Sequence, residues 1–225
     1  MNLSAIVIIP ARNEAVTIAG IVRRVSALGL AVLVVDDASG DGTAALAGEA
    51  GARVVILEHW QGNMRAIRHG LRQALHDPYD YFITMDADGQ HNPEDIPILL
   101  ETAVRENGVI LASCPQRVSH LRRTAWRWFR FLSGLRTRDL TSGFKVYTRQ
   151  AAALLLESEK LYVHYQDVPV LLLLKSRGMS VIEIPVDMCP RVSGISRVFV
   201  SWWVVCRYLA YTSALCCAYR LRVWP

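Results

Sequence analysis

Acidic side chains gather in three short segments of the sequence, and each segment directly follows a run of apolar residues. These segments are residues 10–14 (PARNE), 36–43 (DDASGDGT) and 86–91 (DADGQH). In the third segment, Asp86 and Asp88 project to the same side of an extended chain, and Gln90 can add an amide oxygen. Such oxygen ligands suit Mg²⁺ or Mn²⁺ shared with substrate phosphates. The pattern therefore predicts a divalent metal together with an anionic ligand.

These acids have other interpretations that stay open. Five carboxylates in one place repel one another, and a bound cation would make their closeness tolerable. A lone Asp-x-Asp, however, is often an Asx turn that closes a strand. Asp36 and Asp37 could likewise serve only to cap the next helix, for which Asp41 is a good N-cap residue.

The apolar runs before the acidic segments indicate the strands of a sheet. They are apolar without alternation, as expected for parallel strands covered on both faces. The expected strands are residues 5–9, 31–35, 53–57, 81–85, 109–112 and 181–184. Helical patterns fill the intervals at residues 18–25, at residues 62–75 and from Asn92 onward. This alternation predicts an α/β fold with a doubly wound, mostly parallel sheet, and a ligand beyond the carboxyl ends of the strands.

Composition and missing motifs exclude several classes of protein. The chain has 225 residues, of which 52% are hydrophobic and 20% charged, so it can bury one core and is not disordered. The sequence lacks Gly-x-Gly-x-x-Gly after the first strand and any Gly-Lys-Ser/Thr loop, which speaks against a dinucleotide enzyme and a nucleoside triphosphatase. Five cysteines, unpaired in spacing except for Cys216 and Cys217, argue against a disulfide framework and a zinc site.

The charge balance indicates the partners. The formal net charge is +5 and the pI is about 9.1, with 22 arginines against three lysines. This excess points toward phosphates or an anionic membrane surface, although an arginine-rich genome would give the same bias. We expect no nucleic-acid partner. The N-terminus has neither the basic region nor the cleavage site of a signal peptide, so we expect the chain to start in the cytosol.

The last apolar segment, residues 198–219, is 22 residues long and carries one charge, Arg207. As a helix it would measure about 33 Å, enough to span a bilayer, but Arg207 near its middle would cost about 2.5–3.5 kcal/mol there. We favour a helix lying in the membrane interface, with Trp202 and Trp203 near the headgroups. A spanning helix is the second interpretation, and a buried core or dimer helix is the third. Residues 117–138, with seven arginines among aromatic side chains, favour another interfacial helix.

Six motifs occur in the order and spacing of one enzyme family. They are IIPARNE at residues 8–14, VVDDASGDGT at 34–43, Gly62-Asn63 with Ala66, DADGQH at 86–91, DLTSGFK at 139–145 and the segment 191–197. On these motifs the chain resembles glycosyltransferase family 2, with the GT-A fold, over roughly residues 3 to 197. The segments at 86–91 and 139–145 are most similar to the dolichyl-phosphate or polyprenyl-phosphate mannosyl- and glucosyltransferases.

The resemblance implies a nucleoside-diphosphate sugar that lies across the strand ends. The donor-binding residues that it implies are Pro10, Arg12, Glu14, Asp37, Asp41, Gly62, Asn63 and Asp86, with Arg191 and Arg197 in a loop over the diphosphate. It also implies that Asp86, Asp88 and Gln90 hold Mg²⁺ or Mn²⁺, and that Asp86, Asp88 and Asp167 are catalytic. Arg117, Ser142 and Lys145 would bind the phosphate of a lipid acceptor.

This sequence departs from the family pattern in two places, and Asp167 has two possible roles. Ala112-Ser113-Cys114 stands where relatives commonly have Gly-Ser-Arg, so Arg117 would have to replace the missing arginine. Gly62-Asn63-Met64 replaces Gly-Lys-Gly and removes a basic group near the donor. Asp167 falls near the catalytic aspartate of many relatives, but it would also cap a helix that begins at Val168.

Together these observations predict a GT-A domain in residues 1–197 and an amphipathic, membrane-associated helix in residues 198–225. The expected activity is transfer of a hexose, with inversion, from a nucleoside-diphosphate sugar to a polyprenyl phosphate at the cytoplasmic face of the membrane. One alternative is a family 2 transferase that acts on a sugar or lipid hydroxyl with Asp167 as base. Another is a non-catalytic protein that binds nucleotide sugars.

Overall fold

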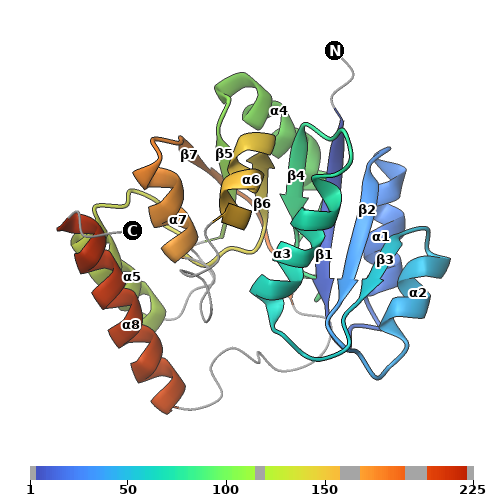
Figure 1. Ribbon diagram of the computed structural model, residues 1–225, viewed down its shortest axis with the longest axis horizontal. Coiled ribbons are helices and arrows are strands. Elements are labelled where there is room, and N and C mark those ends of the chain that lie inside the picture. The colour runs from blue at the N-terminus through green and yellow to red at the C-terminus, as the bar shows by residue number, and fades with distance from the viewer. Residues whose placement is uncertain (1–3, 115–119, 158–167, 191–201, 222–225) are drawn as a thin grey trace.

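The computed structural model describes residues 4–114, 120–157, 168–190 and 202–221. Its centre is a seven-stranded sheet in the order β3-β2-β1-β4-β6-β5-β7 (Figure 1). The strands are β1 (Ala5–Ala11), β2 (Ala31–Asp36), β3 (Arg53–Ile56), β4 (Tyr81–Thr84), β5 (Val109–Ser113), β6 (Lys145–Thr148) and β7 (Val181–Pro185). Neighbouring strands are parallel, except that β6 runs antiparallel to both β4 and β5.

Helices cover both faces of this sheet. They are α1 (Ile18–Ala27), α2 (Thr43–Glu49), α3 (Asn63–Ala74), the 3₁₀ turn η1 (Pro93–Asp95), α4 (Ile96–Glu106), α5 (His120–Ser133), α6 (Arg149–Glu157), α7 (Val168–Ser176) and α8 (Trp202–Arg220). In β1, Val7 and Ile9 pack in the core with α1, α2 and α4, whereas Ile6 and Ile8 pack with α3, α6 and α7. Burial on both faces explains why the strands are unbroken apolar runs in the sequence.

A third cluster of buried side chains lies between α5, α7 and α8. It includes Trp126 and Phe129 of α5, Leu171 of α7, and Tyr208 and Cys216 of α8. Figure 1 draws α5 and α8 side by side, next to α7 and far from β3. No helix among the described residues combines the length and the apolar composition needed to cross a bilayer.

The α/β fold class and the six expected strands are confirmed, with strand ends shifted by two residues at most. The expected helices also occur, although the one predicted from Asn92 starts as the 3₁₀ turn η1 and becomes α-helical only at Ile96. The sequence analysis does not predict β6, because this strand is only four residues long and α6 follows it directly. Its pairing with β4 and β5 is a long-range contact that local periodicity does not reveal.

Gly70 allows α3 to approach the sheet closely and gives a first test of this packing. A Cβ atom at this position would lie 2.4 Å from Cγ2 of Ile8 and 3.0 Å from Cγ2 of Val35. We expect Gly70→Ala to lower the free energy of unfolding by about 1–3 kcal/mol, because the methyl group overpacks a closed core. Urea denaturation followed by circular dichroism measures this change.

The matched control is Gly20→Ala on α1, where an added Cβ would meet nothing within 4 Å. There the same substitution should raise the free energy of unfolding by about 0.5–1 kcal/mol, because alanine has the higher helix propensity. A Gly70→Ala protein as stable as the Gly20→Ala protein would contradict the close packing of α3 on β1 and β2.

Candidate active site

The loops after β1, β2 and β4 meet at one edge of the sheet, because these strands are neighbours and parallel. The first two loops are joined by hydrogen bonds from the Asn13 N–H to Ser39 Oγ and from the Glu14 N–H to Thr43 Oγ1, both 2.9 Å. The hydroxyl of Thr17 donates to the carbonyl oxygen of Ala87 at 2.6 Å and so joins the first loop to the third. The three acidic segments of the sequence therefore border one site.

Asp37 holds the loop that precedes α3. Its carboxylate is buried, and its two oxygens accept the N–H groups of Gln61 (2.7 Å) and Gly62 (2.8 Å). Gly62 has a φ of 92°, a conformation that glycine adopts without a steric penalty. The next residue, Asn63, donates its side-chain N–H to Oδ1 of Asp86 at 3.4 Å. Asp37 thus positions a segment that reaches from β2 to β4, and its contact with a donor stays a prediction.

Asp41 stands just before Gly42, the N-cap residue of α2, and holds the start of this helix. Its Oδ1 accepts the N–H and the hydroxyl of Thr43, and its Oδ2 accepts the N–H of Ala15 at 3.1 Å. Burial by itself would raise the pKa of Asp41, but these hydrogen bonds favour the carboxylate and bring the pKa below its usual range. The N-cap residue of α2 is Gly42, so the prediction that Asp41 is the N-cap residue is wrong by one position. Asp41 instead accepts the N–H of Thr43, the first helical residue, and its role in binding a donor stays a prediction.

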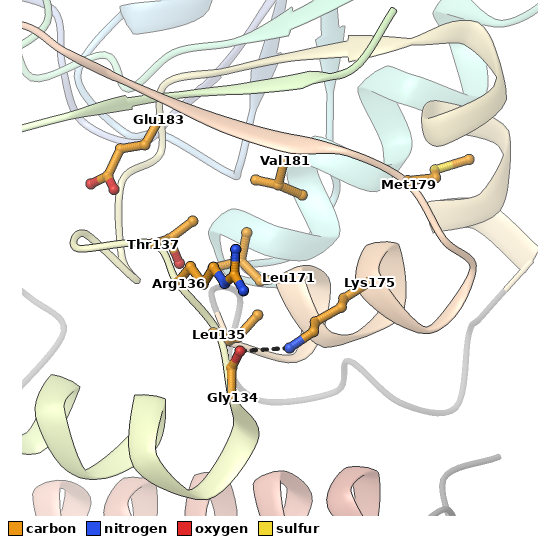
Figure 2. Close-up of a pocket in the computed structure, with 9 residues that line it drawn as sticks. All are labelled: Gly134, Leu135, Arg136, Thr137, Leu171, Lys175, Met179, Val181 and Glu183. Carbon is orange, nitrogen blue, oxygen red and sulfur yellow. Dashed lines mark hydrogen bonds between the residues drawn. The ribbon is translucent and has the colours of Figure 1, made fainter.

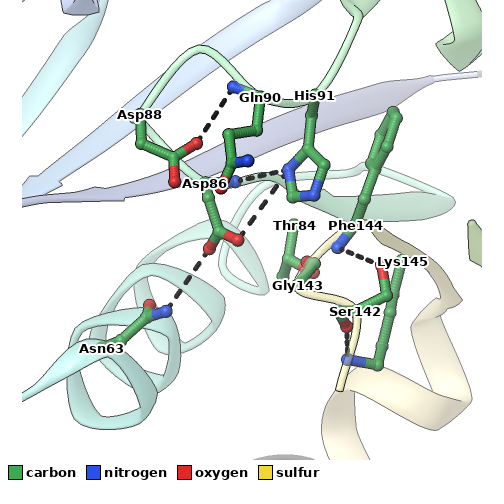
Figure 3. A network of polar contacts seen from close by, with 10 residues as sticks. All are labelled: Asn63, Thr84, Asp86, Asp88, Gln90, His91, Ser142, Gly143, Phe144 and Lys145. Atoms are coloured by element: carbon green, nitrogen blue, oxygen red, sulfur yellow. Dashed lines mark hydrogen bonds and ion pairs between the residues drawn. The ribbon is translucent and has the colours of Figure 1, made fainter. Parts of the chain in front are cut away.

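Asp86, Asp88 and Gln90 lie together in the loop after β4 (Figure 3). Oδ1 of Asp88 accepts the N–H of Gln90 at 3.0 Å, which keeps the loop tight. The N–H of Asp86 donates to Nδ1 of the buried His91 at 3.2 Å, so the ring proton of a neutral His91 is on Nε2. The His91 ring also packs on Phe144, with 5.1 Å between the ring centroids.

Gly143 is the point at which this loop meets the segment before β6. A Cβ atom there would lie 2.5 Å from Oδ2 and 2.7 Å from Oδ1 of Asp86. The Thr84 hydroxyl donates to the Gly143 carbonyl oxygen at 2.8 Å and fixes this approach. The expected acceptor residues flank it: Ser142 Oγ accepts the Phe144 N–H, and the Lys145 ammonium donates to the Ser142 carbonyl oxygen. Asp86, Ser142 and Lys145 are thus brought together (Figure 3).

Lys145 is a buried cation, with only 4% of its surface exposed. None of the ion pairs between residues that the structure describes includes its ammonium group. A buried charge without a counter-ion is costly, and an anionic ligand would supply the counter-ion.

Glu183 of the edge strand β7 holds the segment before β6 in place. The sequence analysis did not single out this residue. The two carboxylate oxygens of Glu183 accept the N–H groups of Arg138 (2.7 Å) and Asp139 (2.9 Å). Asp139 in turn accepts the N–H groups of Thr141 (2.8 Å) and Cys114 (3.4 Å). The signal in the sequence that could have found Glu183 was a carboxylate within the apolar run VIEIP.

Trp60 is a second residue that the sequence analysis missed. It lies just before Gln61 and Gly62, and 67% of its surface is exposed. The guanidinium carbon of Arg12 stands 4.8 Å from the centre of its ring, a cation–π arrangement. An exposed aromatic residue next to an expected donor-binding glycine was the signal that could have found it.

The other expected site residues are placed as follows. Pro10 is buried within β1, opposite Val35 of β2, and Glu14 is half-buried with its carbonyl oxygen accepting the Thr17 and Ile18 N–H groups. Arg117, Asp167, Arg191 and Arg197 lie outside the described residues.

The side chains around Asp86 suit a hard divalent cation that is shared with a ligand. Asp86, Asp88 and Gln90 offer only oxygen atoms, the donors that Mg²⁺ and Mn²⁺ prefer. Among the described residues, no group of three or more His, Cys, Asp or Glu side chains is arranged to enclose a metal ion. Two carboxylates and an amide leave coordination positions for phosphate oxygens and water, as is usual for Mg²⁺ in phosphate-binding sites.

Comparison with known proteins identifies the family. The family model for "Glycosyl transferase family 2" matches residues 6–161. The chain belongs to this family. The glycosyltransferase is 32% identical over 213 residues to the polyprenol monophosphomannose synthase of Mycolicibacterium smegmatis, covering 85% of this chain and 80% of that protein. It is also 32% identical over 184 residues to the undecaprenyl-phosphate mannosyltransferase of Micrococcus luteus, covering 74% of each chain.

Solved structures confirm the GT-A fold of the glycosyltransferase. The structure is similar to glucosyl-3-phosphoglycerate synthase from Mycobacterium tuberculosis in complex with Mn²⁺ and UDP-glucose, with a TM-score of 0.66 and 19% identity. That match covers 100% of this chain and 80% of the other. A further match is mannosyl-3-phosphoglycerate synthase from Rubrobacter xylanophilus, with a TM-score of 0.64, 20% identity and coverage of 98% and 74%.

The lowered pKa of Asp41 predicts a pH-dependent contribution to the stability of the glycosyltransferase. A carboxylate whose pKa is lower in the folded state stabilises the fold above its unfolded pKa, and this stabilisation is lost as the pH falls through the folded pKa. We expect Asp41→Asn to lower the free energy of unfolding by about 1 kcal/mol or less at neutral pH, because the group is exposed. The difference should shrink below about pH 4. Urea titrations across this range test it, and a difference independent of pH would contradict the assignment.

Gly143 gives a prediction about activity. We expect Gly143→Ala to reduce kcat/KM by roughly 10²-fold, because the added Cβ must displace the Asp86 carboxylate and small misplacements in a reaction site cost this much. The matched control is Gly48→Ala on α2, where the nearest atom to an added Cβ is Cγ2 of Val54 at 3.9 Å. Thermal unfolding should show Gly143→Ala to be folded. Wild-type activity in a folded Gly143→Ala protein would mean that the Asp86 carboxylate needs no fixed position.

Proposed function

We propose that this glycosyltransferase moves a hexose from a nucleoside-diphosphate sugar to a polyprenyl phosphate. The observation that carries the proposal is the packing of Gly143 on Asp86 beside the buried ammonium group of Lys145. It places acidic oxygen ligands near a buried cation that makes no ion pair among the described residues. Two phosphate-bearing substrates, one neutralised by a metal and one by a lysine, fit this arrangement.

The donor lies across the ends of β1, β2 and β4 in this proposal. Arg12 and Trp60 offer a cationic and aromatic surface for the nucleoside, and the N-terminal end of α3 at Asn63 approaches the diphosphate. Asp86, Asp88 and Gln90 would hold Mg²⁺ or Mn²⁺, which would neutralise the charge that develops on the leaving nucleoside diphosphate. The role of His91 is to orient the Asp86 backbone, whose N–H it accepts.

The acceptor binds at Ser142 and Lys145, where a hydroxyl and an ammonium group match phosphate oxygens. An oxygen of the acceptor phosphate attacks the anomeric carbon of the sugar. The bond from that carbon to the diphosphate breaks, and the electron pair leaves with the diphosphate, so the configuration inverts. A phosphate is already ionised near neutral pH and needs no strong base, unlike a hydroxyl acceptor. The names of the two mannosyltransferase relatives support the same acceptor class.

We further propose that α5 and α8 form a surface that rests on an anionic membrane. Trp128 and Phe131 of α5 stack on each other, and Nε1 of Trp128 donates to Ser213 Oγ of α8 at 3.0 Å. The exposed apolar side chains on the two helices are Leu121 (72%), Trp128 (51%), Phe131 (73%) and Trp203 (75%). Exposed arginines accompany them, namely Arg122, Arg123, Arg127, Arg207 and Arg220. Aromatic and apolar groups among arginines match the interface of an anionic bilayer.

The site would face the cytoplasm in this proposal. All five cysteines are free thiols, which suits a reducing compartment.

The proposed reaction can be tested directly. Membranes or vesicles with undecaprenyl phosphate are incubated with labelled GDP-mannose, UDP-glucose or UDP-N-acetylglucosamine, and label is measured in the organic phase. We expect one donor to be used and Asp88→Asn to lose roughly 10²-fold or more in rate, because an amide weakens the charge that holds the metal.

Glu49→Gln, an exposed carboxylate-to-amide change on α2, is the matched control and should leave the rate unchanged. Full activity of Asp88→Asn, or of the wild type in excess EDTA, would contradict the metal-dependent mechanism. Transfer to a sugar or lipid hydroxyl, with no product on the lipid phosphate, would contradict the proposed acceptor.

Membrane association is tested by removing exposed aromatic groups rather than α8 itself, since α8 contributes Tyr208 and Cys216 to a core cluster. We expect the double variant with Phe131→Ser and Trp203→Ser to bind phosphatidylglycerol vesicles roughly tenfold or more weakly, because two apolar groups no longer enter the interface. Vesicle cosedimentation measures binding. Ile98→Ser on α4, which is 49% exposed, is the control. Equal losses in both proteins would locate the membrane contact elsewhere.

A further inference from the structure

A cavity of about 350 Å³ lies away from the strand-end site, between β7, α7 and the segment that follows α5 (Figure 2). Its lining residues are Gly134, Leu135, Arg136, Thr137, Leu171, Lys175, Met179, Val181 and Glu183. The volume is within the range of small-molecule sites in proteins. The reaction proposed above makes no use of this cavity.

One part of the cavity wall is cationic. Arg136 and Lys175 both line it, and within the described part of the chain Arg136 makes no ion pair. The Lys175 ammonium donates to the Gly134 carbonyl oxygen at 2.6 Å. Burial first, and then the nearby charges of Arg136 and Arg220, lower the pKa of Lys175. These neighbouring cations repel one another, so an anion in the cavity would be favoured.

The remaining polar groups of the wall do not supply that anion. Glu183 is the one carboxylate among the nine lining residues, and both its oxygens already accept the Arg138 and Asp139 N–H groups. Figure 2 places it at the opposite end of the cavity from Lys175. Thr137 is only 8% exposed, and its hydroxyl has no hydrogen-bond partner within the described residues. A buried hydroxyl without a partner is unusual and fits a site that is completed by a ligand.

The rest of the wall is apolar. Leu135 and Leu171 belong to the cluster of buried side chains between α5, α7 and α8, and Val181 and Met179 continue the apolar surface along β7. The cavity therefore has one charged side and one apolar side. These two sides match the charged head and the hydrocarbon chain of an amphiphilic molecule.

The cavity also lies next to the two helices with the exposed aromatic and arginine side chains. The Lys175 ammonium is 5.7 Å from the centre of the Tyr219 ring on α8. Arg220 donates to the Phe131 carbonyl oxygen of α5 at 3.2 Å. We propose that this cavity binds an anionic amphiphile, with a phosphate or carboxylate headgroup at Arg136, Lys175 and Thr137 and a hydrocarbon chain along Leu135, Leu171 and Val181.

Calorimetric titration of the full chain with octyl phosphate below its micelle concentration tests this inference. Inorganic phosphate and 1-octanol serve as probes of the head and of the chain alone. We expect saturable binding of octyl phosphate and at least tenfold weaker binding of either part. Arg136→Gln should weaken octyl phosphate binding roughly tenfold, the effect of one charge-assisted hydrogen bond. Met179→Trp, which narrows the apolar side, should also weaken it.

Arg177→Gln is the matched control, because this exposed arginine follows α7 and does not line the cavity. It should bind octyl phosphate as the wild type does. Unchanged binding in Arg136→Gln would overturn the inference, as would binding of inorganic phosphate with equal affinity.

The same titration separates the cavity from the acceptor site. If Lys145→Ala abolishes binding and Arg136→Gln does not, the probe occupies the acceptor site, and the cavity inference is wrong while the proposed reaction stands. If Arg136→Gln weakens binding but Asp88→Asn retains full transferase activity, the cavity inference stands and the metal-dependent mechanism does not.

Discussion

The contact of Gly143 with the Asp86 carboxylate is the constraint on which the rest of the site depends. Because no side chain fits between them, the loop after β4 and the segment before β6 must be positioned together. The hydrogen bond from Thr84 to the Gly143 carbonyl oxygen and the packing of His91 on Phe144 secure this contact from both sides. The antiparallel strand β6 is what brings Gly143 there, since Lys145 pairs with Thr84 across the sheet. A parallel strand would start at the opposite edge.

The acidic residues of the site fall into two groups, according to whether their carboxylate oxygens already accept backbone hydrogen bonds. Asp37, Asp41, Asp139 and Glu183 each accept at least two backbone N–H groups with their carboxylates, and so they hold loops. Within the described residues, the Asp86 carboxylate accepts one long hydrogen bond, from the Asn63 side chain at 3.4 Å, and lies 3.9 Å from Nδ1 of His91. Its side chain is 32% exposed. Carboxylates that accept loop N–H groups repel one another only weakly, because these hydrogen bonds already compensate their charge. In the described part of the chain the Asp86 carboxylate lacks such backbone hydrogen bonds, so an external cation would compensate its charge.

Much of the fold can be predicted from the sequence, whereas the side-chain contacts that hold the loops of the site cannot. The strands β1, β2 and β4 are predictable because burial on both faces leaves an unbroken apolar run, and their parallel order alone brings the three acidic loops together. Glu183 is 44 residues from Asp139, and Trp60 is 48 residues from Arg12, so neither contact leaves a local pattern. Likewise, Asp37 is an acid in a family motif, and nothing in the sequence reveals that its oxygens accept the N–H groups of Gln61 and Gly62.

Helix α8 buries polar side chains and exposes apolar ones. Tyr208 and Thr212 are buried, whereas Trp203, Ala210 and Ala214 are exposed together with Arg207 and Arg220. The Thr212 hydroxyl has no hydrogen-bond partner among the described residues, a burial that costs about 1–3 kcal/mol. The arrangement is reasonable if the outer side of α8 meets lipid rather than water, and the exposed aromatic residues of α5 beside it favour the same environment.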